Sequence, residues 1–200
     1  DNIPKLVEAI EKIRLITDVE KIVLVNNGSI DDTSQILASI EHIEGLHVIE
    51  KPKGSTYSEG VLSGLKSTQN TFVLLFHSDL QYCPVNFLKK IHEQGLEIKE
   101  NTFYFGARKN RPKFNRMISF MLRVIVCKVL KLEYLDYNAQ PKLFYNDIDH
   151  SKMESLRGFS IDIAICSANR SRNTKSLDSL EANRENGMSS WNLGAVSLVK

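Results

Sequence analysis

The sequence lacks several features that would assign it to a specialised class of protein. Its 200 residues contain only three cysteines, Cys83, Cys127 and Cys166, which lie far apart without Cys-x-x-Cys spacing. This spacing argues against both a disulfide framework and a zinc site. No apolar run approaches the roughly 20 residues that span a membrane, and the longest candidate is interrupted by Arg123 and Lys128. A cytoplasmic protein is the simplest interpretation.

An excess of charge of one sign is also lacking. The chain has 26 basic and 24 acidic residues, so its formal net charge is +2. This balance provides no general attraction to a polyanion, and we expect no nucleic-acid partner. In contrast, hydrophobic residues make up 42% of the chain, which is enough apolar surface for a sizeable core. We expect a single domain over residues 1–200.

Apolar strands and amphipathic helices alternate through the first half of the sequence. Continuous apolar runs predict strands at residues 21–27, 46–50, 71–76 and 102–108. Helical periodicity predicts helices at residues 1–13, 31–43, 57–68 and 84–98. Strands of this kind, separated by helices, are typical of a mostly parallel sheet with helices on both faces. The predicted fold class is therefore α/β.

The first predicted helix has no strand before it, whereas an α/β unit of this type normally begins with a strand. We therefore expect the chain to be truncated at its N-terminus, with the first strand of the sheet missing. The alternative is a fold that starts with a helix.

Residues 112–132 predict one long amphipathic helix with an apolar face and a basic face. One interpretation is a helix packed on the sheet with its basic side in water. The other is a helix at a membrane surface, with its cations facing anionic lipid headgroups. The polar stretch at residues 167–190 is rich in Ser, Asn and Arg, and we expect it to contain mobile loops.

Ligands bind at the carboxyl ends of strands in an open α/β sheet, so the loops after the strands are candidate sites. Asn27 and Ser29 follow the first predicted strand, where they can hydrogen-bond a nucleoside. Lys53 precedes a helix, where its charge can offset that of a phosphate. Asp79 and Gln81 follow the third strand and carry the oxygen ligands that suit Mg²⁺ or Mn²⁺. The alternative for Asp79 is an Asx-turn before the helix at Pro84.

Four motifs follow one another along the chain: VNNGSIDDT, KPKGSTYSEGVLSGL, FVLLFHSDLQYCP and FGARKNR. In this order and spacing they resemble the nucleotide-sugar half of a family 2 glycosyltransferase with the Rossmann-like GT-A fold. The resemblance is greatest to the dolichyl-phosphate mannose synthase-like branch. The later segments LDYNAQPKLF, FSIDI and RENGMSSW extend it to nearly the whole chain.

The resemblance implies two halves, a nucleotide-sugar-binding half at residues 1–107 and an acceptor-side half at residues 108–200. It implies a nucleoside-diphosphate sugar as donor, Mg²⁺ or Mn²⁺ as cofactor, and an acceptor that includes a polyprenyl phosphate among its candidates. Asp79 and Gln81 would meet the metal, and Asp79, Asp162 and Arg184 would serve catalysis. The residues implied near the nucleotide or its phosphates are Asn27, Ser29, Lys53, Asp79, Arg108, Arg116 and Ser119. Those implied on the acceptor side are Asp136, Asn138, Gln140, Lys142 and Trp191.

Two departures from the family pattern leave alternatives open. His77 stands where the family commonly has the first acid of Asp-x-Asp, and it is either a ligand that suits Mn²⁺ or a neutral, hydrogen-bonded side chain. The first strand would lie before Asp1. From the ordered motifs we predict a glycosyltransferase that acts with inversion at the sugar in the cytoplasm, and contact with the cytoplasmic membrane surface stays one of the two interpretations of the basic helix. The alternatives are a catalytically impaired binding or scaffold protein and, less favoured, a sugar nucleotidyltransferase.

Overall fold

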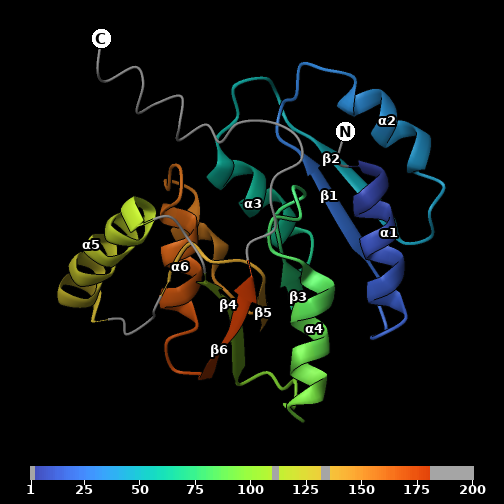
Figure 1. The fold of residues 1–200 in the computed structure, drawn as a ribbon. Helices are drawn as coiled ribbons and strands as arrows, with labels where there is room; N and C mark the ends of the chain where they lie inside the picture. The colour runs from blue at the N-terminus through green and yellow to red at the C-terminus, as the bar shows by residue number, and fades with distance from the viewer. Residues whose placement is uncertain (1–2, 110–112, 132–135, 181–200) are drawn as a thin grey trace.

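The computed structural model describes residues 3–109, 113–131 and 136–180. Within these ranges, helices and strands alternate as an α/β protein requires (Figure 1). The helices are α1 (Ile3–Arg14), α2 (Thr33–Ile40), α3 (Tyr57–Lys66), α4 (Pro84–Glu93), α5 (Lys113–Leu130) and α6 (Ser160–Ala168), with a 3₁₀ turn η1 (His150–Met153). The strands are β1 (Ile22–Asn26), β2 (Leu46–Glu50), β3 (Phe72–Leu75), β4 (Thr102–Lys109), β5 (Lys142–Tyr145) and β6 (Asn173–Leu180).

The described strands form two sheets. β1 and β2 make a parallel pair in which Ile22 lies opposite Leu46, and the other four strands follow the order β3-β5-β4-β6. β4 and β6 are parallel, whereas β5 runs antiparallel to both β3 and β4. The prediction of a parallel-rich α/β fold is confirmed. The antiparallel strand β5 was not predicted, because four residues that include Lys142 do not read as an apolar strand.

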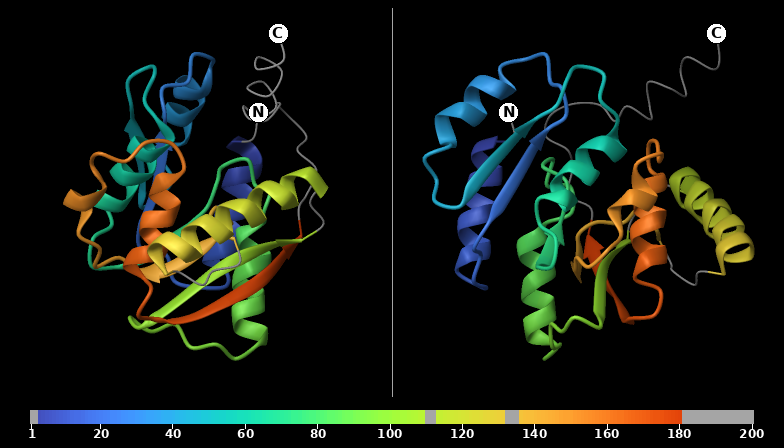
Figure 2. Two further views of the ribbon diagram at one scale, coloured as in Figure 1. Left: turned by 90° about the vertical axis from the view of Figure 1, so that its left-hand side faces the viewer. Right: turned by 180° about the vertical axis from the view of Figure 1, so that it is seen from behind.

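Side chains of β4 and β5 divide the interior into two cores, one on each face of the larger sheet. Phe103, Phe105 and Phe144 pack with α3, α5 and α6 on one face. Tyr104 and Leu143 point to the opposite face, where they meet α1 and α4. The alternation follows from the two-residue period of a strand. It confirms helices on both faces, which Figures 1 and 2 show from three sides.

The start of α3 is fixed by its own sequence. The Thr56 side chain accepts a hydrogen bond from the Glu59 backbone N–H, and the Glu59 carboxylate accepts one from the Thr56 backbone N–H at 2.6 Å. This reciprocal capping box satisfies two donors that the first turn would otherwise leave unpaired. It places Tyr57 as the first residue of the helix.

The long helix α5 lies beside α6 at one side of the molecule (Figure 2). Val126 is 5% exposed and belongs to the core, but Met121, Ile125 and Val129 are 56%, 57% and 71% exposed. The helix was predicted correctly. The interpretation that its apolar face packs on the sheet is wrong for these three residues. No helix in the described ranges combines the length and the apolar character needed to cross a bilayer.

Part of the polar stretch at residues 167–190 is a strand, which the sequence did not predict. Its residues 173–180 form β6, which pairs with β4 along its whole length rather than lying in a loop. Leu177 is 2% exposed, so one apolar side chain anchors the strand while its polar neighbours face outward. The remainder of that stretch, residues 181–190, lies outside the described residues.

Candidate active site

The loops that follow β1 and β2 lie against each other at the carboxyl ends of these strands. Gly28 has φ +78°, and a Cβ there would lie 2.5 Å from the carbonyl oxygen of Pro52. Only glycine permits this approach. Asn27 strengthens the contact by donating from Nδ2 to the Ser55 carbonyl oxygen at 3.0 Å. The two loops predicted to bind the donor therefore meet.

The Asn27 side chain also faces α3, at Gly60. A Cβ on Gly60 would lie 2.9 Å from Asn27 Oδ1, which is buried and has no hydrogen-bond partner within the described part of the chain. A buried amide oxygen without a partner is uncommon, because its desolvation is uncompensated. Ser29 and Lys53, the other residues predicted on these loops, are exposed.

The loop after β3 forms a tight turn around Asp79. Asp79 Oδ1 accepts a hydrogen bond from the Gln81 backbone N–H at 3.2 Å, and the Leu80 N–H donates to the His77 carbonyl oxygen at 3.2 Å. This is the Asx-turn that the sequence left as the alternative for Asp79.

His77 lies against an aromatic surface. Its ring stacks on Tyr57 with 5.4 Å between centroids, and Tyr57 in turn packs against Phe159 at 5.0 Å. The three side chains come from the β3 loop, the start of α3 and the start of α6. This aromatic row connects the predicted metal loop to the acceptor side. Neither Tyr57 nor Phe159 was predicted as a site residue from the sequence. The available signal for Tyr57 was the capping box of Thr56 and Glu59, which marks the start of α3.

Gln140, Lys142 and Asp162, all predicted on the acceptor side or in catalysis, form one buried cluster. Lys142 Nζ lies 2.5 Å from Asp162 Oδ1, and Gln140 Nε2 donates to the same oxygen at 3.0 Å. Lys142 and Asp162 are each 0% exposed. The second carboxylate oxygen of Asp162 and the amide oxygen of Gln140 have no hydrogen-bond partner among the described residues.

Tyr57 borders this cluster as well as His77. Burial raises the pKa of the Tyr57 phenol well above its usual value, and the adjacent Asp162 carboxylate raises it further. The phenol therefore keeps its proton and is available as a donor toward the carboxylate.

Arg108 and Asp136, which were predicted to lie near the phosphates and the acceptor respectively, contact each other in this structure. Arg108 Nε and Nη2 each donate to one Asp136 carboxylate oxygen at 2.5 Å. Burial opposes the charge of Arg108, but the bidentate contact with Asp136 outweighs it and raises the pKa of the guanidinium. Asn138 follows two residues after Asp136. Its side-chain oxygen Oδ1 is buried and has no hydrogen-bond partner among the described residues.

Four predicted residues are not placed by the structure. Arg116 and Ser119 belong to α5, but their side chains are not described, and Arg184 and Trp191 lie outside the described residues.

The protein is an α/β domain with helices on both faces of its sheet and polar loops at the ends of its strands. This architecture is typical of nucleotide-binding proteins. The family model described as Glycosyl transferase family 2 matches residues 1–159. The chain belongs to glycosyl transferase family 2, and the resemblance inferred from the motifs is confirmed.

Curated relatives are distant and longer. An undecaprenyl-phosphate 4-deoxy-4-formamido-L-arabinose transferase of Yersinia pestis (strain Pestoides F) is 21% identical over 184 residues, covering 90% of this chain and 55% of the relative. The protein of the same name in Proteus mirabilis (strain HI4320) is 22% identical over 198 residues, covering 96% and 59%. The chain thus spans somewhat over half of the length of these relatives.

Solved structures share the fold. Glucosyl-3-phosphoglycerate synthase from Mycobacterium tuberculosis, crystallised with Mn²⁺, uridine diphosphate and glucosyl-3-phosphoglycerate, is 15% identical with a TM-score of 0.61. The match covers 97% of this chain and 72% of that one. A second crystal structure of the synthase, with Mn²⁺, uridine diphosphate and phosphoglyceric acid, is 18% identical with the same TM-score and covers 94% and 68%. At these identities the likeness shows the GT-A fold, as predicted.

Proposed function

We propose that the protein transfers a sugar from a nucleoside-diphosphate sugar to a polyprenyl phosphate at the cytoplasmic membrane surface. Family membership supports sugar transfer, and the convergence of Gln140, Lys142 and Asp162 beside Tyr57 carries the assignment of the site. The names of the curated relatives support a polyprenyl-phosphate acceptor. The exposed apolar side chains of α5 support contact with a membrane surface.

The proposed reaction is a direct displacement with inversion. An acceptor phosphate oxygen forms a bond to the anomeric carbon, while the bond from that carbon to the nucleoside diphosphate breaks and its electron pair leaves with the diphosphate. Because a phosphate monoester is already anionic, this attack needs no strong base. Asp136 fixes Arg108 through two hydrogen bonds, which orients the remaining N–H groups of the guanidinium for an anionic phosphate. Lys142 is paired with Asp162 and orients that carboxylate within the site.

The donor set after β3 fits a divalent cation with an open coordination sphere. Asp79 supplies a carboxylate and Gln81 an amide oxygen, whereas no three His, Cys, Asp or Glu side chains gather into a metal site in the part of the chain described. Mg²⁺ is commonly held by one or two carboxylates with substrate phosphates completing the shell. When bound, the cation would neutralise the departing diphosphate. Asp79 and Gln81 would hold it, with Mg²⁺ and Mn²⁺ both compatible.

Titration calorimetry with uridine diphosphate and guanosine diphosphate, each with and without Mn²⁺, tests this function. We expect Mn²⁺-dependent binding of one nucleotide, weakened about 100-fold or more by Asp79→Ala because the cation loses its carboxylate. Asp149→Ala is the matched control. Asp149 Oδ1 accepts the Ser151 backbone N–H at 3.2 Å, so this variant loses the same kind of turn at a position outside the proposed site.

Equal binding by the wild type and Asp79→Ala would overturn the metal assignment and favour the scaffold alternative. Product analysis distinguishes a glycosyltransferase from a sugar nucleotidyltransferase. Glycosyl transfer releases a nucleoside diphosphate, whereas nucleotidyl transfer releases pyrophosphate.

A further inference from the structure

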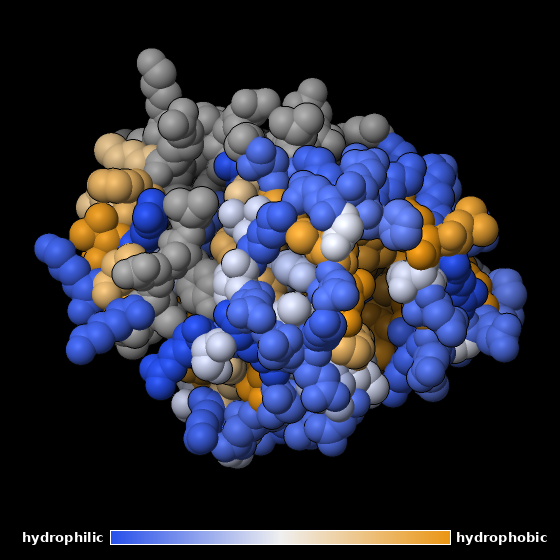
Figure 3. Space-filling view, turned by 90° about the horizontal axis from the view of Figure 1, so that it is seen from below, coloured by the Kyte–Doolittle hydropathy of each residue, from blue (hydrophilic) through white to orange (hydrophobic). Residues whose placement is uncertain are grey.

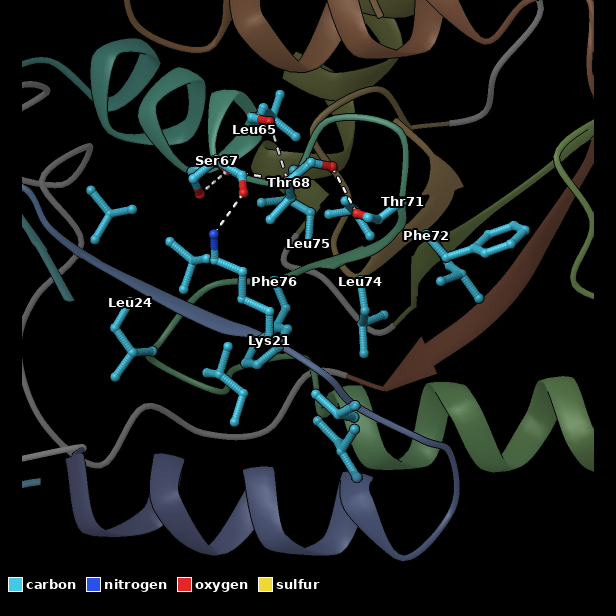
Figure 4. Close-up of a pocket in the computed structure, with 18 of the residues that line it drawn as sticks. Lys21, Leu24, Leu65, Ser67, Thr68, Thr71, Phe72, Leu74, Leu75 and Phe76 are labelled. Atoms are coloured by element: carbon cyan, nitrogen blue, oxygen red, sulfur yellow. Dashed lines mark hydrogen bonds between the residues drawn. The ribbon is translucent and has the colours of Figure 1, made fainter. Parts of the chain in front are cut away.

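The cleft between β1 and β3 is a poor site for a sugar. It has a volume of about 950 Å³ and is lined mainly by apolar side chains, which the view from below shows within a hollow of the surface (Figure 3). Polar groups in its wall are already paired. Lys21 Nζ donates to the Ser67 carbonyl oxygen at 2.8 Å, and Thr71 Oγ1 donates to that of Thr68 at 2.7 Å (Figure 4). Because the hydroxyl groups of a bound sugar need polar partners, those partners lie elsewhere.

Gln140 and Asp162 provide two such partners beyond Tyr57, which lines the cleft and also borders both residues. Asp162 Oδ1 already accepts from Lys142 Nζ at 2.5 Å and from Gln140 Nε2 at 3.0 Å. Asp162 Oδ2 and Gln140 Oε1 are buried and have no hydrogen-bond partner among the described residues. Both atoms can only accept, because neither a carboxylate oxygen nor an amide oxygen carries a proton.

The chemistry of these two oxygens determines which ligand fits them. Two acceptors cannot satisfy each other, and a buried acceptor without a donor has lost the hydrogen bonds that water gave it. The phosphate of a polyprenyl acceptor is anionic and presents further acceptor oxygens, so it would meet Asp162 Oδ2 with like charge. A sugar hydroxyl instead supplies the O–H donor that both oxygens lack.

Arg108 has the complementary chemistry, which suits a phosphate. Its Nε and Nη2 each donate to Asp136, and a guanidinium has further N–H donors beyond such a fork. Burial lowers the pKa of Arg108, but Asp136 outweighs this effect and Asp162 adds to the increase. Arg108 and Asp162 are therefore within electrostatic reach of each other. A group rich in donors and a pair of acceptors lie in one region, where the proposed reaction brings a phosphate to a sugar.

Tyr57 places the two oxygens close to the predicted metal loop. Its ring stacks on His77, two residues before Asp79, with 5.4 Å between centroids, and its phenol borders Gln140 and Asp162. In a nucleoside-diphosphate sugar, the sugar is bonded directly to the diphosphate. Its hydroxyl groups therefore lie near the cation that would hold that diphosphate, and one side chain separates the two positions here.

The path to the buried oxygens leads past Tyr57. This side chain is half-buried, whereas Gln140 and Asp162 are 2% and 0% exposed. Ser58 Oγ donates to the Gly158 carbonyl oxygen at 2.6 Å, which ties the start of α3 to the loop before α6. Because this bond fixes the backbone beside Tyr57, a rotation of the Tyr57 side chain can admit a hydroxyl group without unfolding the helix.

We propose that Gln140 Oε1 and Asp162 Oδ2 accept hydrogen bonds from hydroxyl groups of the donor sugar, and that this pair selects the sugar. The assignment rests on the proposed function, and it moves Gln140 from the acceptor side, where the resemblance had placed it, to the donor. A sugar that lacks the matching hydroxyl leaves the buried oxygens unpaired, and such a site discriminates strongly between substrates.

Titration calorimetry in the presence of Mn²⁺ tests this assignment with UDP-glucose, UDP-galactose and GDP-mannose, each compared with its parent nucleotide. We expect Gln140→Met, which has no amide, to weaken binding of the sugar nucleotide about tenfold. Binding of the parent nucleotide should stay within about twofold of the wild type, because the nucleotide does not reach the pair. Gln35→Met, at an exposed residue of α2, is the matched control and should keep both affinities.

The wild type provides a second measurement that needs no variant. Among monodeoxy analogues of the sugar nucleotide that it binds, at least one should bind about tenfold more weakly, because a buried acceptor loses its donor. Equal affinity for all the analogues would overturn the proposal and assign the two oxygens to a buried water molecule.

Two further results would also overturn the proposal. An equal loss of affinity for the sugar nucleotide and its parent in Gln140→Met would show that Gln140 only supports the structure. Weaker binding of farnesyl phosphate, with unchanged binding of the sugar nucleotide, would return Gln140 to the acceptor side. Failure of the proposed function gives a different result: the wild type then binds neither uridine diphosphate nor guanosine diphosphate with Mn²⁺, and the assignment of the sugar falls with it.

Discussion

Lys142 and Asp162 illustrate how a single buried contact organises the acceptor side. Neither side chain reaches solvent, and each neutralises the other at 2.5 Å. Burying two charges is costly, and their attraction recovers that cost only with good geometry and further hydrogen bonds. Gln140 supplies one such bond, but one oxygen of Asp162 is still unmatched among the described residues. Because this oxygen is already removed from water, a ligand that donates a hydrogen bond to it would stabilise the site.

Removal of one partner tests the importance of this pair. We expect Lys142→Met to lower the free energy of unfolding by about 3–5 kcal/mol, because it leaves the Asp162 carboxylate buried without its cation. Chemical denaturation measures this loss, and adding Asp162→Asn should restore a large part of it. The control is Lys66→Met, which breaks the exposed pair with Glu154 and should cost less than about 1 kcal/mol. Equal losses in the two single variants would contradict the expectation.

His150 predicts a dependence of stability on pH. It is 6% exposed, and its Nε2 lies 3.1 Å from Asn146 Oδ1. Burial, followed by the charge of Lys66, lowers the pKa of His150 below its usual 6.5. The unfolded chain therefore binds a proton more readily than the folded chain, so this contribution to stability is present above pH 6.5 and is lost as the pH falls toward the folded pKa.

Denaturation midpoints measured from pH 7.5 downward check this sign. The fall in stability below pH 6.5 should be shallower in His150→Gln than in the wild type, because the variant has no imidazole to protonate. His42→Gln, at an exposed histidine, should keep the wild-type slope. A steeper fall in His150→Gln would show that the sign is wrong.

At the scale of the element, α5 differs from the other helices. Amphipathic helices usually cover their apolar stripe with a sheet or another helix, but Ile125 and Val129 are mostly exposed, and Lys128 lies between them in sequence. Apolar side chains with flanking cations are what an anionic bilayer surface attracts. This arrangement supports the part of the proposed function that concerns the membrane.

Vesicle sedimentation provides a direct measurement. We expect Ile125→Asn with Val129→Asn to weaken binding to vesicles of phosphatidylglycerol and phosphatidylcholine about tenfold or more, because two apolar side chains no longer enter the lipid. Thermal stability should stay near that of the wild type, since both positions are exposed. Ile30→Asn, at an apolar residue that is 80% exposed in the loop between β1 and α2, should leave vesicle binding unchanged. An undiminished affinity in the double variant would argue against α5 as the contact.

For the whole molecule, β4 and β5 are the layer that both cores share. Phe144 is 1% exposed and packs edge-on against Phe103, with 6.1 Å between ring centroids. The two-stranded β1–β2 sheet has no such central position, and a two-stranded unit is marginal alone. Stability should therefore be concentrated in the larger sheet.

Truncation of one shared side chain tests this distribution. Phe144→Ala should lower the free energy of unfolding by about 3–5 kcal/mol through lost burial and the cavity left behind. Leu15→Ala, at a residue 87% exposed, should change it by less than about 0.5 kcal/mol. If Phe144→Ala proved as mild as the control, the larger sheet would not be the main source of stability.

Local signals predicted much of the fold and part of the site. β1 and β3 were predicted because their apolar runs are continuous, and α1 to α5 because their periodicity is strong. β5 was missed because it has four residues, β6 because it is polar, and α6 because its apolar residues are spread around the helix rather than along one face. Tertiary contacts through residues such as Leu143, Ile165 and Leu177 hold these elements in place. The Asx-turn that the sequence offered as the alternative for Asp79 was found, while no sequence pattern indicated that Tyr57 lies between His77 and Asp162.

The sequence by itself determined the α/β class, the family and the loops where chemistry is expected, because periodicity and motif order are local properties of the chain. Only the tertiary structure decided that Gln140, Lys142 and Asp162 share one buried contact, that Arg108 pairs with Asp136, and that β1 and β3 face each other across a cleft. Those arrangements join residues far apart in sequence, and their energies depend on burial and distance, which no local pattern records.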